Sequence, residues 1–557
     1  MAKARNILFI MFDQLRWDYL SCYGHPALPT PHIDRLAAKG VRFTNARIQS
    51  PLCGPSRMST YTGRYVHSHG AVWNNTPLKV GEMTLGDHLR AQGMEAWLVG
   101  KTHMKADAEG MRRLGLEPDS VIGARLSECG FDVFERDDGM RPEGPKGRYD
   151  ERGALVYNDY LRAKGYAGDN PWHDYANSGR DDDGNVLSGW FLSNSDHQAN
   201  IAEEDSETPY MMRRGMEFIA SRGETPWLCH LSLIKPHWPY IVPAPYHDMF
   251  GPQDFLPLVR AEVDTDHPVM RGFMQAPVAK AFAIPEVREK VLRAYMGLIK
   301  QIDDQMGVLL DWLQAQGRMD DTMIVLTSDH GDYLGDHGMG EKMFFHDCSV
   351  KVPLIVYDPS PEADSTRGTV SDALVEQIDL VPTFVEVAGG APGALDHILE
   401  GHSLRPLIHG QADALPRDRV ICEYDWSHTP LADRMGLHPS QARMMMVADR
   451  RWKLIHFENG ARPVLYDLEN DPQELVDLGA SPDHAGVVAA MYDKLNAWAR
   501  RQSQRQTKSN AAIVAGRRAM GGVGVFIGVV APGQMPPEEE AWYLGRKAPD
   551  MRRGPGG

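Results

Sequence analysis

Short apolar runs that stop at polar residues recur along the chain. Each run is followed by charged or polar residues, and the runs span residues 7–12, 97–99, 227–233 and 323–326. Continuous rather than alternating apolarity is typical of strands that are buried on both faces. Segments with helical character lie between the runs, for example at 84–92 and 287–314. Strands that alternate with helices predict an α/β fold with a large, mostly parallel sheet flanked by helices.

The polar residues that follow these runs are expected to meet at one edge of the sheet. In such sheets, ligands bind beyond the carboxyl ends of the strands. The residues concerned are Asp13, Gln14, Lys101, His237, Asp329 and His330. This edge is therefore the predicted position of a binding or catalytic site.

The pattern of apolar and polar residues changes after residue 400. Apolar runs at 444–447, 452–456 and 464–467, with a helical segment at 484–502, predict a smaller C-terminal antiparallel sheet with one helix packed on it. We therefore expect a catalytic α/β domain over residues 1–400 and a small α+β subdomain over 401–500. Residues 501–557 are expected to form a C-terminal arm that contacts a partner subunit in a homo-oligomer, a dimer or tetramer, or a tail folded on its own domain.

Helical and strand periodicity fades over residues 106–207, where Gly, Asp and Asn accumulate. A long irregular insertion in a compact enzyme is usually a substrate-binding or lid region. A solvent-exposed surface loop without a binding role is nearly as common, so both interpretations of this segment stay open.

The amino-acid composition limits the kinds of partner and the cellular compartment that we expect for this protein. The 557 residues are 42% hydrophobic and 24% charged, as in ordinary globular proteins. A net charge of -16 disfavours nucleic acid and anionic membranes as partners, although a local cationic pocket can still bind an anionic small molecule. The six cysteines are scattered singly, which favours free thiols in a reducing compartment. The apolar run at 7–12 is too short for a signal peptide, and no run approaches the ~20 residues of a membrane span, so a cytoplasmic protein is expected.

One short motif, which begins at Cys53, indicates the type of catalytic chemistry. Cys53 is followed by Pro55 and Arg57, and Thr62-Gly63-Arg64 comes shortly after. A lone cysteine is more often a buried structural residue than a nucleophile. The Cys-x-Pro-x-Arg pattern, however, resembles that of the type I sulfatases of the alkaline phosphatase superfamily, in particular arylsulfatases close to the phosphonate monoester hydrolase branch. The resemblance implies an alkaline-phosphatase-like fold. It also implies that a formylglycine-generating system oxidises Cys53 to formylglycine, the catalytic nucleophile.

The same resemblance implies a metal site. Alone, the pairs Asp13-Gln14 and Asp329-His330 would be helix caps or solvated loops. Both pairs end predicted strands and match the two metal-binding pairs of the family, so with Cys53 they are expected to hold one divalent metal. Oxygen ligands suit calcium, magnesium or manganese. Gln14 and His330 replace harder ligands of calcium-type arylsulfatases, which favours Mn²⁺, with Ca²⁺ as the alternative.

Several cationic or polar residues match the family's substrate-binding and catalytic positions. They are Arg57, Asn74, Lys101, His103, His237 and Lys342. By themselves these side chains would be structural or solvated. The resemblance implies that Arg57, Lys101 and Lys342 hold the anionic oxygens of the substrate and that His237 protonates the leaving oxygen. It also implies that His103 acts as a base and that Asn74, Lys101, His237 and Lys342 contact the substrate.

We therefore expect hydrolysis of a small anionic ester. The first hypothesis is a sulfate monoester hydrolase, an arylsulfatase, that is promiscuous towards phosphonate monoesters and phosphodiesters. Lys101 and His103 favour sulfate. Gly54, with Gln14, Asn74 and His330, instead resembles phosphonate monoester hydrolases and favours the alternative, an enzyme that is primarily a phosphonate monoester hydrolase or phosphodiesterase. A third hypothesis is an unmodified metallophosphatase or metal-binding protein that uses the same sheet without an aldehyde.

Overall fold

The computed structural model describes residues 4–74, 76–118, 120–139, 156–259, 265–519, 533–534 and 537. The chain divides into two compact units. The first comprises Met1–Pro392 and Leu399–Ser503, and the second comprises Gly393–Ile398 and Gln504–Gly557. No helix among the described residues is long and apolar enough to cross a membrane.

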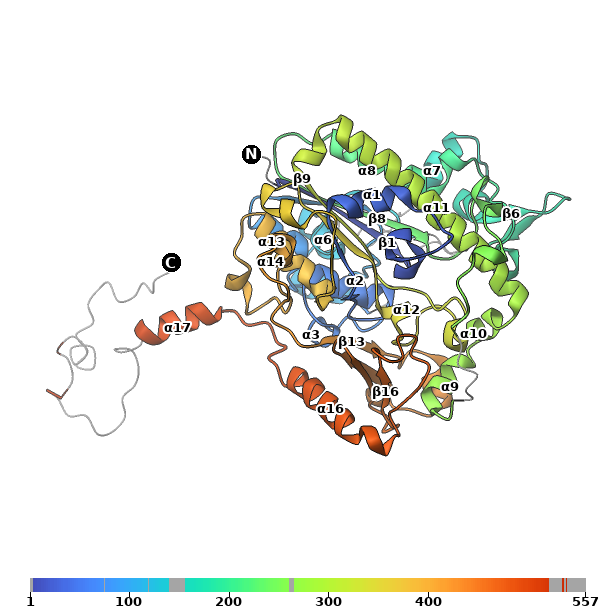
Figure 1. Ribbon diagram of the computed structural model, residues 1–557. Helices are drawn as coiled ribbons and strands as arrows, with labels where there is room; N and C mark the ends of the chain where they lie inside the picture. Colours follow the sequence, from blue (N-terminus) through green and yellow to red (C-terminus); the bar gives the residue numbers. More distant parts are fainter. Residues whose placement is uncertain are drawn as a thin grey trace. The chain divides into compact units, whose positions relative to one another are not determined.

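An eight-stranded mixed sheet forms the centre of the first unit, with strand order β11-β2-β10-β9-β1-β8-β4-β5 (Figure 1). Its strands are β1 (Asn6–Asp13), β2 (Val41–Phe43), β4 (Glu95–Gly100), β5 (Asp132–Arg136), β8 (Trp227–Pro236), β9 (Thr322–Ser328), β10 (Leu354–Tyr357) and β11 (Thr369–Ser371). Strand β10 is antiparallel to both of its neighbours, and the other pairings within the sheet are parallel. The predicted α/β fold with a large, mostly parallel sheet is confirmed.

Helices cover both faces of this sheet because its central strands are apolar on both sides. Leu8 and Phe12 of β1 join a core that also contains residues of α1 (Pro31–Lys39), α8 (Glu207–Ala220) and α11 (Pro285–Ala315). Phe9 points the other way, and its ring lies 5.3 Å from that of Phe384 on α13 (Leu380–Val387). Helices α2 (Cys53–Thr62) and α4 (Leu85–Arg90) contact α13 on that face.

The remaining helices and short strands of the first unit connect these layers. The helices are α3 (Val66–His69), α5 (Ala108–Leu114), α6 (Val121–Ser127), α7 (Val156–Ala163), α9 (Pro268–Met274), α10 (Pro277–Phe282), α12 (Asp347–Val350), α14 (Arg405–Ile408) and α15 (Pro430–Arg434). The short strands are β3 (Ala46–Arg47), β6 (Ser178–Arg180), β7 (Val186–Ser188) and β12 (Val375–Glu376).

The segment 106–207 is more regular than its sequence indicates. It contributes α5, α6 and α7, and its strand β5 forms one edge of the main sheet. Strand β5 reads Asp-Val-Phe-Glu-Arg, because an edge strand is only partly buried and needs no continuous apolar run. Residues 119 and 140–155 of this segment lie outside the described residues.

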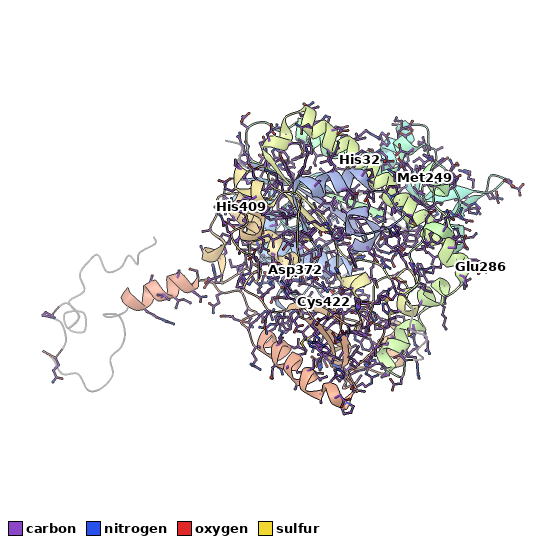
Figure 2. All side chains as sticks on the ribbon, viewed as in Figure 1. His32, Met249, Glu286, Asp372, His409 and Cys422 are labelled. Atoms are coloured by element: carbon purple, nitrogen blue, oxygen red, sulfur yellow. The ribbon has the colours of Figure 1, made fainter. Side chains whose placement is uncertain are left out.

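A four-stranded antiparallel sheet confirms the predicted C-terminal sheet. Its strands are β13 (Val420–Asp425), β14 (Arg443–Ala448), β15 (Trp452–Phe457) and β16 (Val464–Asp467), and α16 (Ala485–Ala499) packs on it. Figure 2 shows Cys422 of β13 in this region. The core between sheet and helix also contains Tyr65 and Ile378 from the larger part of the chain, which explains why both parts form one compact unit.

The second unit contains one α-helix, α17 (Asn510–Ala519), among its described residues. The side-chain amide of Asn510 donates to Asp396 over 2.8 Å, which ties the start of α17 to residues 393–398. The apolar residues 525–530 of the predicted arm lie outside the described residues. The contact of this arm with a partner subunit therefore stays a prediction.

Candidate active site

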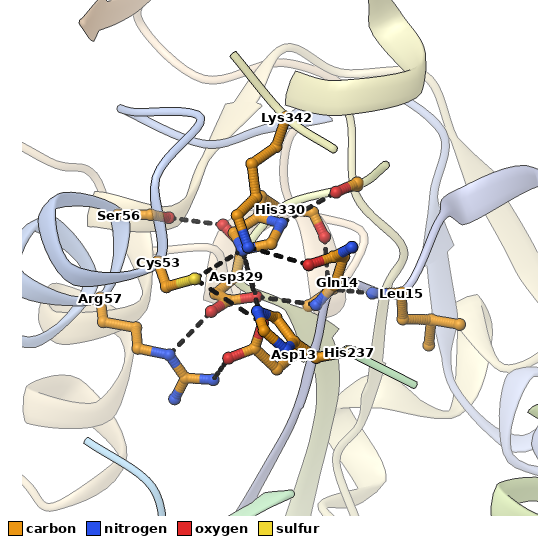
Figure 3. A network of polar contacts seen from close by, with 12 residues as sticks. Asp13, Gln14, Leu15, Cys53, Ser56, Arg57, His237, Asp329, His330 and Lys342 are labelled. Atoms are coloured by element: carbon orange, nitrogen blue, oxygen red, sulfur yellow. Dashed lines mark hydrogen bonds and ion pairs between the residues drawn. The ribbon is translucent and has the colours of Figure 1, made fainter. Parts of the chain in front are cut away.

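Four strands and one helix bring the predicted site residues together. Asp13 is the last residue of β1, Asp329 follows β9, Lys101 follows β4, and His237 follows β8. Cys53 is the first residue of α2. Figure 3 shows the side chains of most of these residues converging beyond the carboxyl ends of the strands. The position predicted from the apolar runs is therefore the position of the polar cluster.

Cys53 lies buried at the amino terminus of α2. Its Sγ is 3.0 Å from Nε2 of His330 and 3.8 Å from Oδ1 of Asp13. The neighbouring Gly54 donates its backbone N–H to Oδ1 of Asn74 over 2.9 Å. A Cβ at position 54 would lie 3.0 Å from both Cα and Oδ1 of Asn74, so glycine permits this close approach. Asn74 thus positions the start of α2, and a contact with substrate stays a prediction.

Arg57 is fully buried and binds both carboxylates of the site. Its Nε donates to Asp329 over 2.7 Å, and one Nη donates to Asp13 over 3.3 Å. The other Nη donates to the Lys101 carbonyl and to Ser232 Oγ. Burial disfavours the guanidinium charge, but Asp329 and Asp13 outweigh burial and raise the pKa of Arg57. Arg57 therefore holds the carboxylates in place, and its expected contact with the ester oxygens stays a prediction.

Asp13, Cys53, Asp329 and His330 form a cluster of possible metal ligands. One donor atom of each lies within 4.8 Å of those of the others, and all four residues are buried. His330 Nδ1 donates to the Gly331 carbonyl over 2.8 Å, which leaves the Nε2 lone pair facing the cluster. Two buried carboxylates beside an imidazole suit a divalent cation such as Mn²⁺ or Ca²⁺. The residues present therefore fit the expected metal.

Gln14 belongs to the same cluster through hydrogen bonds. Its Oε1 accepts from Lys342 Nζ over 2.8 Å, and its Nε2 donates to Tyr240 over 2.8 Å and to Asp332. Its backbone has a φ of 67°, a conformation that residues other than glycine rarely adopt and that recurs at functional sites. The amide oxygen of Gln14 is engaged by Lys342, so its role as a metal ligand stays a prediction. No sequence motif marks Tyr240, whereas Asp332 stands two residues after the second predicted ligand pair, Asp329-His330.

Lys101 and Lys342 place two ammonium groups beside the nucleophile position. Lys101 Nζ lies 2.6 Å from Oδ2 of Asp13. Burial opposes the charge of each lysine, but negative neighbours outweigh it: Asp13 chiefly raises the pKa of Lys101, and Cys53 and Asp13 raise that of Lys342. Both ammonium groups remain charged at neutral pH, so they are available to hold an anion.

Two of the site's histidines, His237 and His103, have surroundings that disfavour their protonated forms. Burial and the charge of Lys342 hold the pKa of His237 well below its usual value, and burial and Lys101 lower the pKa of His103. His237 Nδ1 donates to the Trp238 carbonyl over 2.7 Å, so its Nε2, 4.0 Å from Asp13, faces the site. A neutral imidazole accepts a proton, which suits the expected role of His103 as a base.

Asp138 supports the position of His103 and was not anticipated from the sequence. Its carboxylate accepts the backbone N–H groups of Thr102 and His103, each over 3.1 Å. His103 itself has a φ of 55°. Asp138 follows β5, so the segment 106–207 reaches the site, which favours the first interpretation of this segment, a substrate-binding region. No local motif marks Asp138, because its partners lie 36 and 35 residues away.

Family models, curated proteins and solved structures similar to this chain all belong to one group of hydrolases. Residues 5–136 and 155–391 match the family described as "Sulfatase", and residues 335–501 match "N-sulphoglucosamine sulphohydrolase, C-terminal". The multifunctional alkaline phosphatase superfamily protein PehA of Trinickia caryophylli is 29% identical, over 89% of this chain and 95% of the relative. An arylsulfatase of Clostridium perfringens is 26% identical, over 86% of this chain and 91% of the relative. The structure of a phosphonate monoester hydrolase, SpPMH, from Silicibacter pomeroyi superposes with a TM-score of 0.76 at 27% identity and covers 90% of this chain and 96% of that chain.

Proposed function

Because the chain belongs to the sulfatase family, we propose that it is a formylglycine-dependent hydrolase of sulfate monoesters, above all aryl sulfates, that also cleaves phosphonate monoesters and phosphodiesters. The observation that carries the proposal is the burial of Cys53 at a helix amino terminus, with His330 3.0 Å from its Sγ. Lys101 and Lys342 supply positive charge to the same place. A formylglycine-generating system is the partner that this proposal requires.

A metal is part of this proposal. Asp13, Asp329, His330 and residue 53 would hold it, with Gln14 as a further candidate. When bound, a divalent ion supplies Lewis-acid polarisation of the substrate oxygens and acidifies a nearby hydroxyl. Arg57 keeps both carboxylates oriented for this purpose through its hydrogen bonds to Asp329 and Asp13.

The residues then divide the reaction into two steps. A hydrated aldehyde at position 53 would have two hydroxyl groups. One of them would lose its proton to solvent and attack the sulfur through its oxygen, while the alkoxide would leave on the opposite side and take a proton from His237. Binding of the anion favours the protonated form of His237 that this transfer needs. His103 next takes the proton of the second hydroxyl, the bond from carbon to the sulfated oxygen breaks, and sulfate departs. The aldehyde is regenerated, and a water molecule hydrates it again.

A second candidate is an enzyme that is primarily a phosphonate monoester hydrolase. The contact between Gly54 and Asn74 favours it, since both residues resemble that branch of the family. The similarity to the hydrolase from Silicibacter pomeroyi supports it too. Sulfate, phosphonate and phosphodiester substrates all present a tetrahedral anionic centre to Lys101 and Lys342, so one site serves all three.

Relative rates decide between the candidates. We expect kcat/KM to be highest for an aryl sulfate, with slower hydrolysis of an aryl phosphonate monoester and a phosphodiester under the same metal. The peptide that carries residue 53 is expected to lose the mass of sulfur and two hydrogens and to gain that of one oxygen. An unmodified peptide in fully active protein would contradict the aldehyde mechanism. A faster phosphonate rate would favour the second candidate.

Metal removal is expected to lower activity by about 100-fold or more, because the lysines alone must then hold the anion. Chelation with EDTA followed by dialysis tests this, with metal content measured by mass spectrometry. We expect Mn²⁺ to restore more activity than Ca²⁺. The Asp329→Asn variant serves as a control, because added metal should restore little of its activity. Full activity of the metal-free protein would refute the assignment.

A further inference from the structure

Two tryptophan rings lie beside the histidine that faces the leaving group. The ring of Trp238 is 4.3 Å from that of His237, at an interplanar angle of 38°. The ring of Trp190, from the segment 106–207, meets Trp238 edge-on at 5.1 Å and 64°. Both tryptophans are half-buried, so neither residue is closed off completely from solvent. The sequence singled out neither ring, because they are 48 residues apart in the chain and only the fold makes them neighbours.

Buried polar contacts hold these rings in place. Lys235 Nζ donates to Asn177 Oδ1 over 2.6 Å and to the Pro239 carbonyl over 2.9 Å. This ammonium group therefore ties the segment that carries His237 and Trp238 to the segment that carries Trp190.

The backbone beside Trp190 is fixed as well. Gly189 donates its N–H to the Asn177 carbonyl over 3.0 Å. A Cβ at Gly189 would lie 2.5 Å from that carbonyl oxygen and 3.1 Å from Pro239. The indole N–H of Trp190 donates to Nδ1 of His173 over 3.1 Å. Trp190 is thus held by its backbone and by its ring.

Trp238 differs in one respect. Within the described part of the chain, its buried indole N–H meets no acceptor. A buried donor without a partner costs free energy, so an acceptor atom on a bound ligand would recover that cost. The ring is therefore not committed to a structural hydrogen bond among these residues.

We propose that Trp190 and Trp238 bind the leaving group and select esters of aromatic alcohols over esters of alkyl alcohols. This inference rests on the proposed function. In an in-line displacement the leaving oxygen lies opposite the nucleophile, next to the acid that protonates it, and His237 is the residue assigned to that step. The group attached to that oxygen must then lie against the neighbouring rings, and aromatic pairs prefer such edge-to-face and offset contacts.

A second group of rings adjoins the residue that binds the start of α2. Trp73 precedes Asn74, which binds the backbone of Gly54. The Trp73 ring is stacked with Tyr424 at 6.1 Å and with His428 at 5.4 Å. Asn74 links this group to the amino terminus of α2, and among the described residues no ring contact joins Trp73 to His237. This group is therefore not assigned to the leaving group.

The test compares two esters whose leaving alcohols have equal acidity, one phenolic and one a fluorinated alkyl alcohol. Matching the acidity removes the chemical advantage of the phenol, so the remaining difference reports on binding. We expect Trp190→Leu to lower kcat/KM for the aryl ester by about 10-fold and to leave the alkyl ester within about 2-fold. Trp190→Phe keeps a ring and is expected to retain most of the discrimination.

The alkyl ester controls for folding, and Trp97→Leu controls for loss of a half-buried tryptophan. Trp97 lies on β4 and packs against Phe218 at 5.8 Å, so its loss should change both rates equally. Equal losses on both esters in Trp190→Leu would overturn the leaving-group assignment and leave the proposed function intact. A wild-type enzyme that hydrolyses neither ester would overturn the proposed function and this assignment with it.

Discussion

Replacement of Cys53 by serine is expected to stop the enzyme after one covalent step and to lower kcat by about 10³-fold or more. A serine hydroxyl at the start of α2 can still attack the ester, because Asp13 and His330 surround that position. It has no second hydroxyl on the same carbon, so the sulfated or phosphonylated residue cannot collapse to an aldehyde. Intact mass spectrometry after substrate addition should show one added sulfate or phosphonate per chain. Release of the alcohol should stop at one equivalent.

The matched control for this variant is Cys22→Ser. Cys22 is a free, half-buried cysteine at the helical turn Ser21–Tyr23, and the mechanism does not use it. We expect this variant to turn over at close to the wild-type rate and to accumulate no adduct. Sustained turnover by Cys53→Ser would contradict the two-step scheme, since it would mean that water hydrolyses the covalent ester directly.

The predictable parts of the fold are those whose burial is evident from a run of apolar residues in the local sequence. Strands β1, β8 and β9 are buried along their whole length and mostly apolar because helices cover both of their faces. The 31-residue helix α11 follows the expected range 287–314 closely. Strands β2, β10 and β11 have only three or four residues each. Segments that short have no measurable period, so the extent of the sheet was not predictable.

The candidate site likewise has features that could be predicted from the sequence and features that could not. The motif around Cys53 and the pairs that end β1 and β9 could be found because each stands in one short stretch of sequence. The contact between Gly54 and Asn74 spans 20 residues, and that between Lys342 and Gln14 spans 328. Such contacts depend on how the loops fold over the sheet. This is why the hydrogen bonds of Arg57 to Asp13 and Asp329 emerged only from the structure.

Replacement of Arg57 by methionine is expected to lower the free energy of unfolding by about 3–5 kcal/mol and to abolish activity. Methionine keeps much of the side-chain volume, but it leaves the fully buried Asp329 carboxylate without its 2.7 Å ion-pair partner. It also removes one of the cations beside the buried Asp13, which keeps Lys101. Burial opposes the charge of Asp13, but Lys101 and Arg57 outweigh burial and hold the pKa of Asp13 well below its usual range. The shift in the midpoint of urea unfolding, with tryptophan fluorescence as the signal, measures the loss.

Arg35→Met provides the comparison, because Arg35 pairs with Asp311 at the surface, where the two side chains are 39% and 68% exposed. This change is expected to cost less than about 1 kcal/mol. The double variant Arg57→Met/Asp329→Asn separates two causes of the stability loss, the unpaired charge of Asp329 and the altered packing at position 57. If the loss in Arg57→Met comes from an uncompensated carboxylate, neutralising Asp329 should recover part of the stability without restoring activity. Equal stability of Arg57→Met and the double variant would instead assign the loss to packing, and the electrostatic role of Arg57 would be wrong.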